Sequence, residues 1–315
     1  MYAIAEDGCL RVNPLTVGPG GAAGGLDADD PSAAPSMRRS FRVSPMPLSA
    51  LSVLRTDLLA IGGHDNSVML YSSSSGTSLA KCQAHADTVT CLAASPCRSV
   101  LVSGSRDQSV RTWAFGNASL KNDEAFDDIQ HPITCLDASR QLVLAGASDG
   151  QLMAWDVRSG SPVLDRELGG PTVACALHSD EQFAMAMDST GDVRLWDFRR
   201  QCESLRLCVI GRVAGGILAT AACFLTDFSS HILVGGSDAA GAPVVALWDI
   251  PEQRQLRAWA LDVSGAEGGS SAVCATAPRP VRFLLRPLRR QDGGEPALCA
   301  PILCATAAGD IHALT

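Results

Sequence analysis

The sequence lacks the motifs that most enzymes and metal-binding proteins carry. It contains no His-Glu-x-x-His, no Gly-x-Ser-x-Gly and no glycine-rich loop followed by Lys-Ser or Lys-Thr. Its 12 cysteines include no Cys-x-x-Cys pair, and its 6 histidines lie singly along the chain. These absences favour a protein that is not an enzyme and that uses neither a metal nor another cofactor.

Basic charge and long apolar runs are also scarce. The formal net charge of -8 argues against a nucleic-acid-binding protein, because such proteins normally present a basic face. The longest apolar stretch, 213–225, is interrupted by Gly215 and Gly216 and is too short to span a bilayer. The N-terminus has no basic region followed by an apolar segment, as a secretory signal would. We therefore expect a cytoplasmic protein without a transmembrane segment, whose association with membranes is only indirect.

What the sequence does contain is a repeat. Segments 58–72, 100–114, 142–156 and 183–197 each run from an apolar stretch through small residues and a polar turn to an alternating stretch that ends in an aromatic residue. Successive aromatic residues are 42, 42, 41 and 52 positions apart, and they are Tyr71, Trp113, Trp155, Trp196 and Trp248. A period near 40–45 residues with this pattern predicts the four-stranded blades of a β-propeller.

The polar turn of the repeat has its own chemistry. Asp65, Asp107 and Asp149 each lie six residues before the aromatic residue, and Thr190 takes this place in the next repeat. An aspartate in a tight turn accepts hydrogen bonds from the backbone of that turn. The pattern therefore predicts a fixed corner between the second and third strands of each blade.

The cysteines follow the repeat as well. One cysteine falls in the segment expected to form the inner strand of each blade, and these residues are Cys91, Cys135, Cys175, Cys223 and Cys274. A free cysteine packs as a small hydrophobe, which suits a crowded inner strand. Because the five residues belong to different blades, we expect equivalent core positions, 12 unpaired thiols and no metal.

One repeat resembles the WD-repeat family in full. It carries the buried hydrogen-bonding set of that family, and the members are His85, Ser103, Asp107 and Trp113. The resemblance implies that these side chains lock together the strands of one blade. The other repeats are degenerate, since Ala145 replaces the serine in the next one, although the dipeptide Trp-Asp recurs at Trp155, Trp196 and Trp248.

The predicted fold is an all-β WD-repeat β-propeller of about seven blades within a single domain, 1–315. Five blades are clear between about 47 and 261, and three strands of a further blade are expected at each end of the chain. The first and last blades are thus incomplete, which suggests a piece of a longer protein. Two insertions, 17–37 and 286–298, are expected to be loops, and the first is expected to be disordered.

A closer resemblance concerns the N-terminal half. The stretch that precedes the first clear blade, and the third strand of that blade, carry Arg39, Ser40, Ser44, Met46, Leu48, Ser49, Asp65, Asn66, Val68, Tyr71 and Ser72. This pattern resembles the C-terminal propeller of BEACH-domain proteins of the neutral sphingomyelinase activation-associated type, over about residues 1–200. The resemblance implies a scaffold that binds other proteins in membrane traffic or lipid signalling.

An alternative rests on Arg158 and Arg199. Each arginine ends a Trp-Asp-x-Arg sequence, which is similar to the box that docks the adaptor in substrate receptors of cullin-RING ubiquitin ligases. Under the scaffold hypothesis, partners instead bind loops on the propeller face that carries the aspartate turns. The candidates there are His64, Asn66, Arg106, Gln108, Gln130 and Ser148.

Overall fold

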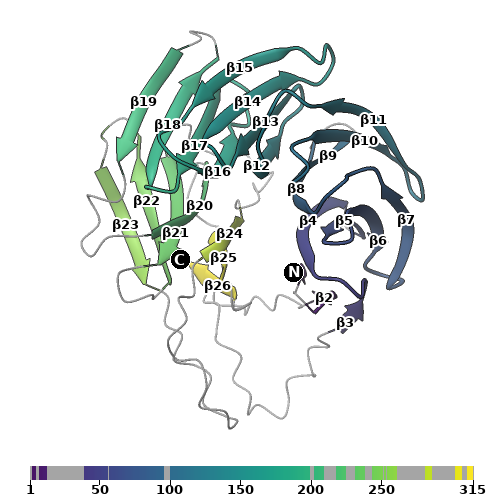
Figure 1. The fold of residues 1–315 in the computed structure, drawn as a ribbon. Helices are drawn as coiled ribbons and strands as arrows, with labels where there is room; N and C mark the ends of the chain where they lie inside the picture. Colours follow the sequence, from purple (N-terminus) through teal and green to yellow (C-terminus); the bar gives the residue numbers. More distant parts are fainter. Residues whose placement is uncertain are drawn as a thin grey trace, which may run out of the picture. The chain divides into compact units, whose positions relative to one another are not determined.

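The computed structural model contains β-strands and connecting turns throughout its described part (Figure 1). It describes residues 2–4, 7–12, 39–55, 57–95, 100–198, 202–208, 218–224, 231–237, 243–250, 252, 254–260, 281–285, 302–306 and 311–314. Within these residues there is no helix long and apolar enough to cross a membrane. The expected loops at 17–37 and 286–298 lie outside the described residues, as does the cysteine-containing segment 272–277.

The chain divides into two compact units, Met1–Arg140 and Gln141–Thr315. The strands of the first unit are β1 Tyr2–Ile4, β2 Cys9–Val12, β3 Arg39–Arg42, β4 Leu48–Arg55, β5 Leu58–Gly63, β6 Ser67–Ser72, β7 Thr77–Gln83, β8 Val89–Ala94, β9 Val100–Ser105, β10 Val110–Phe115, β11 Leu120–Phe126 and β12 Ile133–Ala138.

The second unit begins with the strand that follows β12 in the chain. Its strands are β13 Leu142–Ala147, β14 Gln151–Asp156, β15 Pro162–Glu167, β16 Thr172–Leu177, β17 Phe183–Asp188, β18 Asp192–Asp197, β19 Cys202–Cys208, β20 Leu218–Phe224, β21 His231–Ser237, β22 Pro243–Asp249, β23 Arg254–Ala260, β24 Val281–Leu285, β25 Ile302–Thr306 and β26 Ile311–Leu314.

The described strands form seven antiparallel sheets, five of four strands and two of three. In every sheet the strands follow one another in chain order, as in β4-β5-β6-β7 and β16-β17-β18-β19. The three-stranded sheets are the first, β1-β2-β3, and the last, β24-β25-β26. The prediction of about seven blades with incomplete first and last blades is therefore confirmed.

The strands of a sheet differ in burial, as the second and fourth strands of two sheets show. All six residues of β5 and of β13 are buried, whereas β7 and β15 are mostly exposed. A strand with both faces buried must pack against a neighbouring sheet on each side, and a near-continuous apolar sequence permits this. Thus Trp113 of β10 belongs to the same buried core cluster as Ala60 and Leu70 of the preceding sheet.

The first strands β4, β8, β16 and β20 each carry a bulge at their second or third residue. The register between the first and second strands shifts at Ser49, Thr90, Val173 and Thr220. The hydroxyl oxygen at three of these positions lies within 3.5 Å of a carbonyl oxygen of the opposing second strand. The pairs are Ser49 and Gly62, Thr90 and Gly104, and Thr220 and Gly235.

Strand register also corrects one expectation about the cysteines. Cys91 pairs with Gly104, one residue beyond Ser103, whereas Cys175 pairs with Ala186, which occupies the place of Ser103 in its own sheet. Cys223 lies a further position along its strand. The three cysteines are on first strands, as expected, but they occupy three successive positions rather than one equivalent position. The preference for small apolar side chains therefore applies along the whole first strand and not at a single position.

Candidate interaction surface

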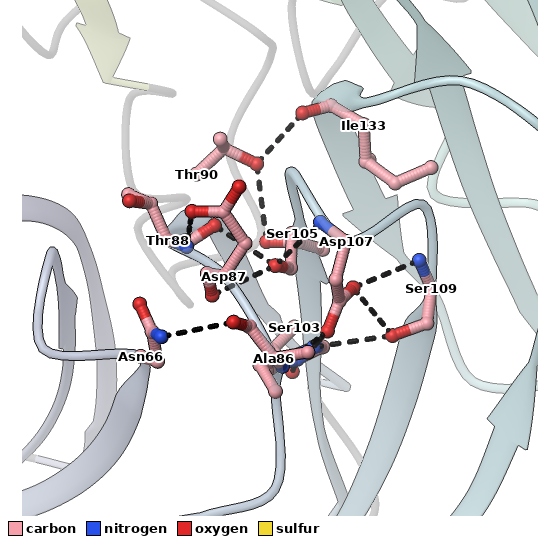
Figure 2. Close-up of polar contacts among 12 residues, drawn as sticks. Asn66, Ala86, Asp87, Thr88, Thr90, Ser103, Ser105, Asp107, Ser109 and Ile133 are labelled. Atoms are coloured by element: carbon pink, nitrogen blue, oxygen red, sulfur yellow. Dashed lines mark hydrogen bonds and ion pairs between the residues drawn. The ribbon is translucent and has the colours of Figure 1, made fainter.

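In the first unit, the β5–β6 and β9–β10 turns lie at the same edge as the loops that precede β4 and β8. The backbone amide of His64 donates to the carbonyl of Pro47 (3.0 Å), and that of Arg106 donates to Thr88 (2.9 Å). The side chain of Asn66 then reaches the next sheet, where its Nδ2 donates to the carbonyl of Ala86 (3.1 Å; Figure 2). These bonds connect successive turns and loops, and we call this part of the first unit the turn-bearing edge.

Asp107 fixes the best-defined turn of this edge (Figure 2). Its carboxylate accepts hydrogen bonds from Ser109 N (3.0 Å), Ser109 Oγ (2.7 Å), Ala86 N (2.8 Å) and His85 Nδ1 (2.9 Å). The turn places Gln108 at φ 74°, in the left-handed region that non-glycine residues seldom occupy. The bonds to Asp107 hold this strained backbone in place, so the exposed side chains of the turn are presented from a fixed position.

The four residues expected from the family resemblance come together behind this turn. His85 Nε2 lies 2.6 Å from Ser103 Oγ, and Trp113 Nε1 donates to the same Ser103 Oγ at 2.8 Å. The indole, the hydroxyl and the neutral imidazole each have one hydrogen to donate, and this sets the direction of the three hydrogen bonds. Trp113 donates to Ser103, Ser103 donates to His85 Nε2, and His85 Nδ1 donates to Asp107.

The electrostatics of this set follow from burial and hydrogen bonding. Burial lowers the pKa of His85 and outweighs the opposing effect of Asp107, so the imidazole is neutral at neutral pH. Burial alone would raise the pKa of Asp107, but the hydrogen bonds from Ser109 and Ala86, together with His85, hold it at about 2. The set is therefore a chain of hydrogen bonds between an ionised aspartate and neutral partners.

Two of the other sheets keep the tryptophan and lose the serine. Ala186 and Val234 stand where Ser103 stands in its sheet, two residues beyond the one opposite the tryptophan. Trp196 and Trp248 are fully buried, and no described residue accepts a hydrogen bond from either indole N–H. Packing alone holds these two side chains.

One turn residue was not anticipated from the sequence. The Thr190 position was expected to replace the turn aspartate, but Asp188 performs this role. Its buried Oδ1 accepts from Thr190 N (2.9 Å), Thr190 Oγ1 (2.6 Å) and Asp192 N (3.0 Å). The signal was the sequence Asp-Ser-Thr-Gly-Asp at 188–192, in which the aspartate is displaced by two residues from its usual position.

The structure places the predicted partner-binding residues as follows. His64, Arg106, Gln108 and Gln130 are exposed and Asn66 is half-buried, all in the first unit. Ser148 is half-buried and lies in the second unit. It therefore cannot be assigned to the same surface as the other five.

The two arginines of the alternative hypothesis have different outcomes. Arg158 is exposed in the turn after β14, at the opposite end of that strand from Asp149. Its backbone amide donates to Asp156 Oδ1 at 2.7 Å. Arg199 lies outside the described residues.

Within the described residues, no group of three or more His, Cys, Asp or Glu side chains is placed to hold a metal ion. Burial raises the pKa of the Cys91 thiol to about 12, which keeps it protonated and unreactive at neutral pH. The described arrangement thus offers fixed turns and exposed polar side chains.

These features define a WD-repeat β-propeller fold. Residues 76–114, which include Trp113 and its hydrogen-bonding partners, match the family model for the WD domain, G-beta repeat. Among solved structures, the chain is similar to a computationally designed protein called Ika8, with 19% sequence identity and a TM-score of 0.65. That match covers 99% of this chain and 79% of the designed protein, and it concerns the fold alone.

Proposed function

We propose that this protein is a protein–protein interaction scaffold that binds partners through its turn-bearing edge. WD40 repeats mediate protein interactions, and one such repeat is present here at 76–114. The observation that carries the proposal is the Asp107 turn. Four hydrogen bonds fix its carboxylate while Arg106 and Gln108, on either side, remain exposed. A turn backbone held in this way loses little conformational entropy when a partner binds.

The setting that we propose is a scaffold of BEACH type in membrane traffic or lipid signalling. The support for it is the sequence pattern around Met46 and Asp65, which resembles the propeller of those proteins. We propose a single propeller domain over 1–315, located in the cytoplasm, with proteins rather than nucleic acids as partners.

Site-specific crosslinking tests this proposal. A photo-crosslinking amino acid would replace Arg106 or Gln108, and in a matched control it would replace Lys121, which is exposed on β11 away from the turns. We expect specific proteins of membrane traffic or lipid signalling to crosslink at 106 and 108 and not at 121. Equal crosslinking at all three positions would contradict an interaction surface at the turn-bearing edge.

The second candidate function is that of a substrate receptor of a cullin-RING ligase. The observation that favours it is the exposure of Arg158 at the end of β14 opposite Asp149. Under this hypothesis, replacement of Arg158 and Arg199 by alanine should abolish recovery of the cullin adaptor from cells. Under the scaffold hypothesis, the same double variant should retain its partners, and Arg106→Glu should lose them.

A further inference from the structure

The turn-bearing edge carries an exposed apolar side chain. Met46 is 46% exposed and lies in the loop that precedes β4. Two other large apolar side chains of the first unit are exposed to a similar degree, but Val53 lies near the far end of β4 and Leu79 lies on the outer strand β7. Of these three, Met46 is the one on the edge where we place partner binding.

The loop holds Met46 in a fixed outward position. Pro45 and Pro47 flank it and restrict the backbone on both sides. The Met46 amide donates to Ser44 Oγ (3.1 Å), and the Ser44 amide donates to the carbonyl of Gly8 (3.2 Å). Gly8 lies so close beneath the loop, with φ 77°, that an added Cβ would be 2.9 Å from the Met46 carbonyl oxygen. Covering an exposed apolar side chain with a partner is favourable, and the fixed backbone of this loop loses little conformational entropy on binding.

Two further hydrogen bonds connect the loop that contains Met46 to the rest of the turn-bearing edge. Pro47, the next residue, accepts from the amide of His64, and the adjoining turn reaches Ala86 through Asn66. Asp87, which follows Ala86, is exposed. Met46 lies two residues before Leu48, which pairs with Gly63, and Asp87 lies two residues before Val89, which pairs with Ser105. Met46 and Asp87 therefore occupy corresponding places in two successive loops.

The described loops at the turn-bearing edge are acidic, whereas those at the opposite edge of the first unit are balanced in charge. The described loops of the turn-bearing edge contain one arginine, Arg106, and six aspartates, namely Asp7, Asp65, Asp87, Asp107, Asp127 and Asp128. The described loops at the opposite edge contain one arginine, Arg140, and one aspartate, Asp57. A partner of positive charge is thus complementary to the edge that carries Met46 and not to the opposite edge.

From these observations we infer that the turn-bearing edge binds a protein segment in which an apolar side chain stands next to lysine or arginine. The apolar side chain covers Met46, and the cationic group lies against Asp87. This inference rests on the proposed function, because it names the kind of partner that the same surface takes. It also explains why the loop before β4 keeps a methionine in solvent.

Selection of binding peptides tests the inference. A library of random peptides displayed on phage would be selected on the full chain. We expect the enriched peptides to contain Leu, Ile, Met or Phe within two residues of Lys or Arg. Synthetic versions should lose affinity about tenfold with Met46→Ser, and again with Asp87→Lys, a loss typical of removing an interface anchor.

Matched variants at the opposite edge provide the controls. Val53→Ser removes an exposed apolar side chain from β4, and Asp57→Lys makes the same charge change as Asp87→Lys. Both should leave affinity unchanged. Enrichment of acidic or purely polar peptides, no enrichment, or equal loss with the control variants would overturn the inference.

This result is separable from the test of the proposed function. If crosslinking at 106 and 108 captures specific partners while the selected peptides ignore Met46 and Asp87, the scaffold proposal stands and this inference fails. If crosslinking at those positions captures nothing specific, the proposed function fails whatever peptides are selected.

Discussion

The hydroxyl of Thr90 donates to the carbonyl of Ile133 at 2.7 Å, and this bond joins the first strand of one sheet, β8, to the next first strand in the chain, β12 (Figure 2). The same hydroxyl lies 3.1 Å from the carbonyl of Gly104 in its own sheet. Ser49 makes the corresponding bond to Val89. The bulge residue of a first strand thus links two sheets through one hydroxyl group.

Replacement of Thr90 by valine should destabilise the protein. Valine keeps the shape of the side chain but leaves the carbonyl of Ile133 without this donor, and an unsatisfied buried acceptor costs about 1–3 kcal/mol. Urea unfolding would measure the loss. Thr77→Val, on the exposed strand β7, is the matched control and should change the free energy of unfolding by less than about 0.5 kcal/mol.

Gly104→Ala should also destabilise, for a steric reason. A Cβ at this position would lie 2.6 Å from Ile133 Cγ2 and 2.7 Å from Cys91 Sγ. Overpacking of this kind costs about 1–3 kcal/mol. At Gly169 the nearest atom to an added Cβ is Arg194 Nη2 at 3.6 Å, so Gly169→Ala should be nearly neutral. Equal melting temperatures for the two variants would show that β9 and Ile133 are not closely packed.

Asp107→Ala should lower stability clearly more than Asp123→Ala. Loss of the Asp107 carboxylate leaves His85, Ala86 and Ser109 without their acceptor, whereas Asp123 is exposed on β11. Each unsatisfied group costs about 1–3 kcal/mol. Thermal unfolding of both variants measures the difference, and similar melting temperatures would mean that the hydrogen-bonded set contributes nothing.

Acidification should destabilise the protein in two steps. The pKa of His85 is lower in the folded chain than its ordinary value of 6.5, so as the pH falls below 6.5 the unfolded chain takes up a proton first. The pKa of Asp107 falls from 3.8 to about 2 on folding, so the unfolded chain again binds the proton first between those values. Stability is therefore complete above pH 6.5 and is lost in both windows as the pH drops.

A variant separates the two steps. His85→Gln should remove the upper step from the pH dependence of the unfolding free energy and leave the lower one. The control His64→Gln, at an exposed position, should leave both steps unchanged. Loss of the upper step in the control, or its persistence in His85→Gln, would assign the titration to another group.

Ala186→Ser should stabilise the sheet that contains Trp196. The serine oxygen would stand where Ser103 accepts from Trp113, and it would provide an acceptor for the buried Trp196 N–H. A net gain of about 0.5–1.5 kcal/mol is expected for one buried hydrogen bond. Ala176→Ser places a hydroxyl elsewhere in the same core and should destabilise. If both variants destabilise, the register equivalence of Ala186 and Ser103 does not extend to their side chains.

Much of the fold was predictable because its signals are local. The aspartate turns and the aromatic residue that ends each third strand repeat at a nearly constant spacing, and β6, β10, β14 and β18 form at the expected places. The set around Trp113 was predicted from the resemblance of one repeat to the WD-repeat family. The role of Asp188 was missed because a displacement by two residues still allows a side chain to reach the turn backbone.

By itself, the sequence determined the repeat and the turns, because each depends on spacing within one hairpin or between adjoining segments. The residues of the buried hydrogen-bonding set followed from the resemblance to the WD-repeat family. Only the tertiary structure decided the bulge at Thr90 and the three different positions of Cys91, Cys175 and Cys223. Register depends on which residue of the partner strand lies opposite and on how closely the next strand approaches. A small apolar side chain fits at several neighbouring positions of a first strand. The pattern of cysteines along the sequence therefore does not specify which of these positions each one occupies.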